Sequence, residues 1–100
     1  MVLPMGFGDS GRASKDEAVV NLGSSGEYAR KCTVRSNGAR SLFALVNVTA
    51  ATFDAQHILG NTIEIPTTET FTFEGEGNGD IRSVCIRTDT GNTGYLIGAY

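Results

Sequence analysis

The stretch 62–87 constrains the fold of this chain more than any other part. It reads TIEIPTTETFTFEGEGNGDIRSVCIR, in which short alternating runs lie on both sides of Pro66 and of a glycine-rich acidic loop. A period of two places every second side chain on the same face of a strand. The stretch therefore predicts strands at 62–65, 68–74 and 81–87, with 75–80 as the hairpin turn between the last two. Alternation places Ile63, Ile65, Phe71 and Phe73 on the inward faces of the first two strands.

A second hairpin is predicted around Asn37 and Gly38. The strand before it, residues 27–35, places Cys32 and Val34 on one face, and Asn-Gly is the strongest short hairpin signal. The strand after it, residues 41–51 (SLFALVNVTAA), is apolar on both faces and is expected in the middle of a sheet.

The remaining segments complete an all-β pattern. Residues 52–61 predict a loop or a short helical turn whose apolar side chains plug one end of the core, namely Phe53, Ile58 and Leu59. Residues 88–94 predict a turn, and 95–100 a last strand. We therefore expect a small antiparallel β-sandwich or barrel of about six to eight strands.

The N-terminal segment, residues 1–26, differs from the rest in being rich in glycine, serine and asparagine. It predicts an extended N-terminal arm, with one short strand or turn at 18–22, that gains order by lying on a neighbour or on its own sheet. A plain disordered terminus is the alternative. The predicted organisation is thus an arm over 1–26 and a single β domain over 27–100.

Composition limits the class of partner. The chain has 100 residues and a net charge of −3, which does not favour a nucleic-acid surface. No apolar run approaches the roughly 20 residues that a membrane helix needs. The N-terminus lacks the basic region and the uninterrupted apolar core of a signal peptide, so we expect synthesis in the cytoplasm and no membrane partner.

Cys32 and Cys85 fall in separate predicted strands. They form either one disulfide or two buried free thiols, and the second reading is favoured because free cysteine packs like a small hydrophobe. Two isolated cysteines and His57 do not make a zinc site. We expect no cofactor.

Acidic and amide side chains alternate with glycine at Glu74, Glu76, Asn78 and Asp80. Such oxygens in a flexible loop are the type of ligand that Ca²⁺ takes, although the spacing is not that of an EF-hand. A solvated hairpin loop is the favoured reading.

Three further motifs suggest chemistry without supporting it. Asp89-Thr90-Gly91 matches the triplet of aspartic proteases, but a β-turn explains it better, so the protease stays a remote alternative that uses Asp89. His57 has no partner at a spacing diagnostic of a catalytic triad. The glycosylation sequon at Asn47 lies in the expected central strand and is attributed to chance. We therefore do not expect an enzyme.

Basic residues surround the first predicted hairpin. Such a cluster can meet an acidic partner surface, although a solvated, charged edge strand is the commoner meaning. A small β domain with an arm and open edges is expected to bind or assemble, as a homo-oligomer. The predicted partner-binding residues are Phe7, Arg12 and Lys15 of the arm, and Arg30, Lys31, Arg35 and Arg40 of the hairpin.

The part of the chain from residue 62 onward resembles small virion proteins of tailed bacteriophages. The similarity lies in TIEIPTTETFTFEG, a strand with an Ile-Pro step and a Phe-rich strand, and in the closing strand YLIGAY of small and aromatic residues. The resemblance implies a location in the virion and a capsid decoration subunit, commonly a trimer, that staples capsomers together and touches the shell with its arm. A head–tail or tail accessory protein, and a free-standing carbohydrate- or protein-binding β module, are the alternatives.

Overall fold

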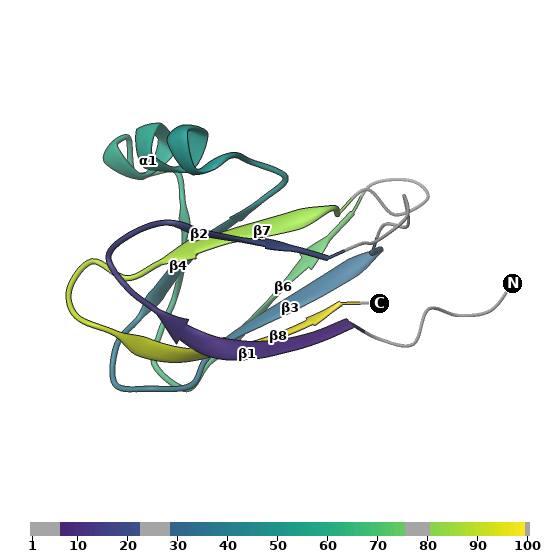
Figure 1. Cartoon of the computed structure of the whole chain (residues 1–100), viewed down its shortest axis with the longest axis horizontal. Coiled ribbons are helices and arrows are strands. Elements are labelled where there is room, and N and C mark those ends of the chain that lie inside the picture. The colour runs from purple at the N-terminus through teal and green to yellow at the C-terminus, as the bar shows by residue number, and fades with distance from the viewer. Residues whose placement is uncertain (1–6, 23–28, 76–80, 100) are drawn as a thin grey trace, which may run out of the picture.

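Two four-stranded antiparallel sheets pack face to face in the computed structural model, which describes residues 7–22, 29–75 and 81–99 (Figure 1). Sheet A has the order β1 (Phe7–Ala13), β8 (Thr93–Ala99), β3 (Lys31–Ser36), β6 (Thr70–Glu74). Sheet B has the order β2 (Ala18–Asn21), β7 (Ser83–Arg87), β4 (Leu42–Val46), β5 (Ile63–Ile65). The one described helix is α1 (Ala50–Ile58). The predicted all-β antiparallel sandwich is confirmed.

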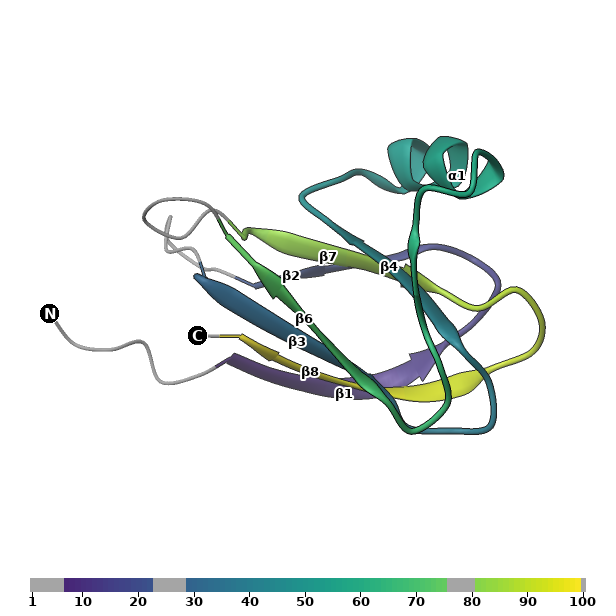
Figure 2. The same ribbon diagram turned by 180° about the vertical axis from the view of Figure 1, so that it is seen from behind.

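The strands follow the jelly-roll topology. Along the described chain, each strand lies in the sheet opposite to the one before it, except that β5 follows β4 within sheet B after α1. Eight strands in two four-stranded sheets with this order form the double Greek key of that fold. Figure 2 shows the crossing connections between the two layers from behind.

Because the strands on either side of each predicted turn lie in opposite sheets, both predicted hairpins are wrong. The Asn37-Gly38 segment joins β3 in sheet A to β4 in sheet B, and the Asn37 N–H donates to the Gly94 carbonyl over 2.8 Å. The segment 75–80 likewise leads from β6 in sheet A to β7 in sheet B, although its residues 76–80 lie outside the described part. Local turn chemistry predicts that the chain reverses, but the partner of each strand is chosen by contacts far away in the sequence.

The described part of the predicted arm belongs to the sandwich, which corrects the boundary at residue 26. Strand β1 pairs with β8 over its whole length, and β2 pairs with β7. A Cβ on Gly11 would lie 3.0 Å from the Tyr95 hydroxyl, so this glycine lets the Tyr95 ring lie close against β1. The two glycines of β1, which suggest an arm in the sequence, therefore lie in a paired strand, and the short strand or turn predicted at 18–22 is the strand β2.

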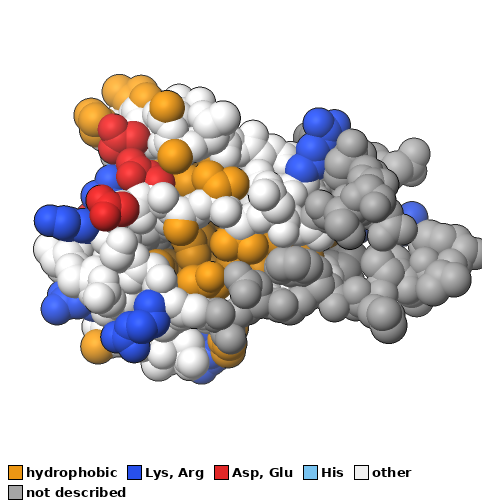
Figure 3. Space-filling model, viewed as in Figure 1, with side chains coloured by type: hydrophobic (Ala, Val, Ile, Leu, Met, Phe, Trp, Pro, Cys, Tyr) orange, Lys and Arg blue, Asp and Glu red, His pale blue; other side chains and the backbone are white. Residues whose placement is uncertain are grey.

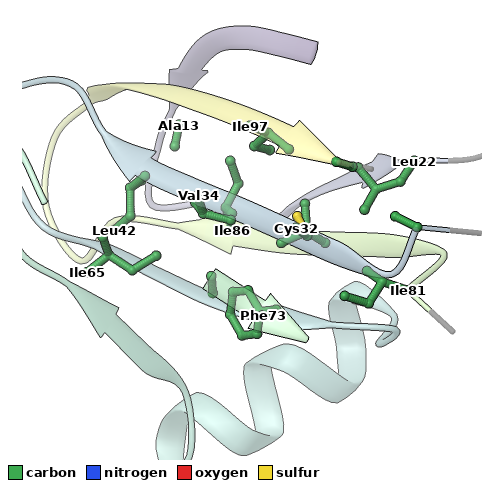
Figure 4. Packing of buried hydrophobic residues seen from close by; sticks show 14 residues of the cluster. Ala13, Leu22, Cys32, Val34, Leu42, Ile65, Phe73, Ile81, Ile86 and Ile97 are labelled. Atoms are coloured by element: carbon green, nitrogen blue, oxygen red, sulfur yellow. The ribbon is translucent and has the colours of Figure 1, made fainter. Parts of the chain in front are cut away.

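The core lies between the inner faces of the two sheets (Figure 4). Of the positions predicted to face inward, Cys32, Val34, Ile65 and Phe73 are buried in it, whereas Phe71 is 38% exposed. It draws on residues from both ends of the described chain; its largest members are Leu22, Leu42, Ile65, Phe73, Ile81, Ile86 and Ile97.

Strand β4 is shorter than predicted. It ends at Val46 because Asn47 has a φ of 60°, which leaves the extended region, and Thr49 then caps α1 by accepting a hydrogen bond from the Thr52 N–H over 3.2 Å. Leu42 and Ala44 of β4 are buried, and the strand lies between β7 and β5, in the middle of its sheet as predicted. The apolar run 41–51 therefore contains a strand, a turn and the first residues of a helix.

Thr68 lies in an unfavourable backbone conformation. The Glu69 N–H donates to the Pro66 carbonyl over 3.0 Å, so residues 66–69 form a β-turn, and Thr68 in its third position has a φ of 65°. A β-branched residue rarely adopts this left-handed conformation, which glycine or asparagine tolerates.

We predict that Thr68→Gly raises the free energy of unfolding by about 1 kcal/mol, because the released strain exceeds the entropic cost of glycine. The neighbouring Thr67→Gly is the matched control and lowers it by about 0.5–1 kcal/mol. Urea denaturation of both variants measures the two signs. Equal losses of stability in the two variants would contradict the strain at Thr68.

Candidate functional site

Helix α1 lies across the outer face of sheet B, at the top of the molecule in Figure 1. Its inner side is fixed by two rings: Phe53 is fully buried, and its ring stacks on that of His57 with 5.9 Å between centroids. The His57 ring also meets the edge of Phe43 of β4 at 4.7 Å. The helix is therefore held to the sheet by a small second core outside the main one.

The outer side of α1 carries an exposed apolar stripe. Ala51, Ala55, Ile58 and Leu59, which we call the α1 stripe, follow the spacing i, i+4, i+7 and i+8 of one helix face, and all four are exposed. Ile58 and Leu59 are 78% and 69% exposed. Figure 3 shows hydrophobic side chains on top of the molecule over α1, with acidic side chains just below them.

Of the three side chains predicted to plug one end of the core, only Phe53 is buried, and it packs outside the main core, whereas Ile58 and Leu59 are exposed. The sequence does contain the spacing that reveals the stripe, but it becomes visible only once a helix is assigned to 50–58. The run Ala50-Ala51 after Thr49 is the local signal for that helix, since threonine is a good N-cap and alanine a strong helix former.

His57 does have partners, which sequence reasoning missed. Its Nε2 lies 2.6 Å from Asp89 Oδ1, and its Nδ1 lies 2.7 Å from Thr62 Oγ1. Both ring nitrogens are thus used to hold the last turn of α1 to the loop after β7 and to the residue before β5. Asp89 is 32 residues away in sequence, so no spacing rule connects it to His57.

Arg87 joins three carboxylates around the same place. Its guanidinium lies 3.5 Å from Asp54 of α1, 3.7 Å from Asp89 and 3.8 Å from Glu17 of the loop between β1 and β2. Asp54 and Asp89 are half exposed, so each pair adds little to stability. Around Arg87, below the α1 stripe, carboxylates therefore outnumber cationic side chains.

The Asp89-Thr90-Gly91 triplet forms part of the predicted turn between β7 and β8. Thr88 Oγ1 donates to the Gly91 carbonyl over 2.7 Å, and Gly91 has a φ of 65°. The Asp89 carboxylate contacts an imidazole and a guanidinium. A protease dyad requires instead two carboxylates that share a proton.

The predicted partner-binding cations are not brought together. Lys31 and Arg35 share the outer face of sheet A with exposed Arg12, whereas Lys15 lies in the loop between β1 and β2. Arg30 precedes β3, and Arg40 follows it, where its Nη1 donates to Thr90 Oγ1 over 2.9 Å. Phe7 begins β1. These residues therefore cover several surfaces rather than one basic cluster.

A cleft of about 530 Å³ opens beside the N-terminal end of α1. Its walls combine amide and hydroxyl side chains with small apolar ones, and Asn47 is fixed there because its Oδ1 accepts a hydrogen bond from the Arg82 N–H over 2.7 Å. The sequon side chain is thus engaged within the fold. The lining residues are Val19, Asn21, Asn47, Val48, Thr49, Ala50, Arg82 and Ser83.

The suggested calcium ligands lie mostly outside the described residues. Glu74 ends β6, whereas Glu76, Asn78 and Asp80 belong to the segment 76–80. Within the described ranges, no group of three or more His, Cys, Asp or Glu side chains is arranged to hold a metal ion. The calcium site therefore stays a prediction. No helix within these ranges has the length and hydrophobicity that crossing a membrane requires.

Cys32 and Cys85 are both buried free thiols, as the favoured reading predicts. Cys32 belongs to the main core, whereas Cys85 lies between the core residues Val84 and Ile86 and so points to the opposite face of sheet B. Burial raises the pKa of each thiol to about 11, and for Cys85 the nearby Glu17 carboxylate adds to the effect of burial.

We predict that neither thiol reacts with a thiol reagent at pH 8 while the protein is folded, because a pKa near 11 keeps the reactive thiolate scarce. Both react in denaturant. Titration of thiols with and without urea, under non-reducing conditions, measures this. A single reactive thiol in the folded protein, or none after unfolding, would contradict it.

Comparison with known proteins gives the fold alone. No protein-family model matches the sequence, and no curated protein does. A solved structure titled "Crystal structure of PirA" is similar, with a TM-score of 0.56, 13% sequence identity, and coverage of 93% of this chain and 92% of that chain. The similarity extends over nearly the whole of both chains, so the aligned region of each corresponds to a single β-sandwich.

Proposed function

We propose that this protein is a structural subunit of a bacteriophage virion, in particular a capsid decoration subunit that binds the head shell through the α1 stripe. The observation that carries the proposal is the exposure of Ile58 and Leu59 on a helix whose inner side is already fixed to the sheet. Jelly rolls are a common architecture of viral capsid proteins. The resemblance of the chain from residue 62 onward to phage virion proteins points the same way.

The stripe has the properties of a docking surface. Burying the side chains of Ile58 and Leu59 against a partner contributes about 1.5–3 kcal/mol each. That is a weak contact for one subunit, but many copies on one particle, or an oligomer that binds several shell sites, multiply it through effective concentration. The carboxylates Asp54 and Asp89 beside the stripe favour a partner whose apolar pocket is bordered by cations.

The double variant Ile58→Ser, Leu59→Ser is predicted to abolish co-sedimentation with phage heads purified from the organism that encodes the chain. Because both side chains are exposed, the free energy of unfolding changes by no more than about 0.5 kcal/mol per substitution. Ala51→Ser, at the other end of the stripe, is the matched control and retains most of the binding.

Two results would contradict the virion role. One is absence of the protein from purified particles by immunoblotting. The other is undiminished binding of the double variant to heads. Recovery in the tail fraction alone identifies instead the head–tail or tail accessory protein, which uses the same surface at another position.

A second candidate function, binding of a neutral carbohydrate, is favoured by the cleft beside α1. Its volume lies within the range of small-molecule sites, and its amide and hydroxyl groups match sugar hydroxyls above the apolar Val19 and Val48. Lectins are also common among jelly rolls. This function would need no virion.

Under this second function, Asn21→Ala weakens binding of an oligosaccharide about tenfold, because it removes an amide from the cleft wall. Thr70→Ala on sheet A is the control and has no effect. A glycan array followed by calorimetric titration of any sugar it identifies measures the effect. No binding on the array, or equal binding by both variants, excludes the cleft.

A further inference from the structure

Strand β6 is an open edge of sheet A. It pairs with β3 on one side, and no described strand pairs with it on the other. Proteins usually shorten or disrupt exposed edges with charges, glycine or proline. The other three edges fit this rule: β2 has four residues, β5 has three, and β1 contains two glycines and Arg12. The sequence of β6, TFTFE, has a charge only at its end.

The hydrogen bonds to β3 define which backbone groups face the open edge. The Gly75 N–H donates to the Arg30 carbonyl over 2.7 Å, and the Ser36 N–H donates to the Glu69 carbonyl over 3.2 Å. Hydrogen-bonded residues alternate along an antiparallel ladder, so Phe71 and Phe73 also direct their N–H and C=O groups to β3. Those of Thr70, Thr72 and Glu74 consequently point to the open edge.

The inner face of β6 is not completely buried. Phe71 lies opposite fully buried Val34 in the pairing register, yet it is 38% exposed. Its ring meets Phe73 edge to face with 4.8 Å between centroids. An inward-facing aromatic ring stays exposed here because the sheet ends beside it.

We propose that β6 pairs antiparallel with β6 of a second copy of this chain, about a two-fold axis at Thr72. Thr72 then lies opposite Thr72 of the second copy, and Thr70 lies opposite Glu74. Every open N–H and C=O of the two edges is paired in this register, because the three residues with open groups meet only one another.

The side chains complement one another in the same register. Phe71 lies opposite Phe73 of the second copy on the inner face, in the closer non-hydrogen-bonded pairing, so the exposed ring gains an aromatic neighbour. The threonines meet on the outer face, and no like charges are opposed. A shift by one residue would place open backbone groups opposite closed ones, and a shift by two would leave an open residue of each strand without a partner. The register about Thr72 therefore pairs more of the open groups of two copies than either shift does.

The result is an isologous dimer with a continuous eight-stranded sheet, made from the two four-stranded A sheets. The dimer interface includes neither the α1 stripe nor the cleft, so a test of the dimer is independent of both proposed functions. It differs from the trimer that the resemblance to decoration proteins implies.

Size-exclusion chromatography with light scattering, over a concentration series of the full chain, tests the interface. The wild type is expected to dimerise as concentration rises. Thr72→Pro removes an N–H that faces only the open edge, so it abolishes the dimer while preserving the ladder with β3. Thr72→Val retains the N–H and the branched shape, and is the matched control that still dimerises.

A charge experiment tests the register and does not depend on the proline variant folding. Thr72→Lys and Thr72→Glu each oppose two like charges on the axis and weaken their own dimer about two- to fivefold. An equimolar mixture restores the dimer as a one-to-one heterodimer. Circular dichroism confirms that each variant is folded.

Three results would overturn the proposal. The first is a wild type that stays monomeric at every concentration. The second is a dimer or trimer that folded Thr72→Pro leaves intact. The third is a mixture of the lysine and glutamate variants that associates no better than either variant alone.

Discussion

The rest of the structure depends on burial of one face of each sheet against the other. The side chains that fill this space come from residue 13 to residue 99, and no two consecutive strands complete it alone. Because the chain crosses repeatedly between the layers, β1 and β8, near the two ends of the chain, pair over their whole length. A small domain has only about 5–15 kcal/mol of stability, so this non-local core is its main source.

Which side chains face inward is well predicted by the sequence, whereas which strands are neighbours is not. Alternation at Cys32, Val34 and Phe73 is a local property of each strand, and all three are buried as predicted. The Asn37-Gly38 signal is equally local, but β3 takes β8 and β6 as its partners, which lie far away in the chain. Knowing which face of each strand is buried is compatible with many strand orders, and an order made of consecutive hairpins is only the simplest of them.

The candidate site was less predictable because its parts are close only in three dimensions. His57 meets Asp89 through the crossing from β7 to β8, and the α1 stripe requires that residues 50–58 form a helix rather than the end of a strand. Glycines in β1 suggest a flexible arm unless the Tyr95 ring that covers Gly11 is known. In each case the missing information is a neighbour that local periodicity does not identify.

Among the described residues, the completed core leaves the apolar α1 stripe and the open backbone edge of β6 without a neighbour. They lie on different sheets, since α1 covers the outside of sheet B and β6 ends sheet A. One copy can therefore use both at once, pairing with a second copy through β6 while α1 stays available to another protein. This separation is what a subunit that both self-associates and docks on a larger assembly requires.

Residue-specific amide hydrogen exchange along β6 tests the open edge most directly. In dilute solution the account predicts slow exchange at Phe71 and Phe73, which donate to β3, and fast exchange at Thr70, Thr72 and Glu74. At high concentration the Thr72 amide should become protected as the second copy pairs with it. Protection of Thr72 at the lowest concentration, or fast exchange of Thr72 at every concentration, would contradict the account.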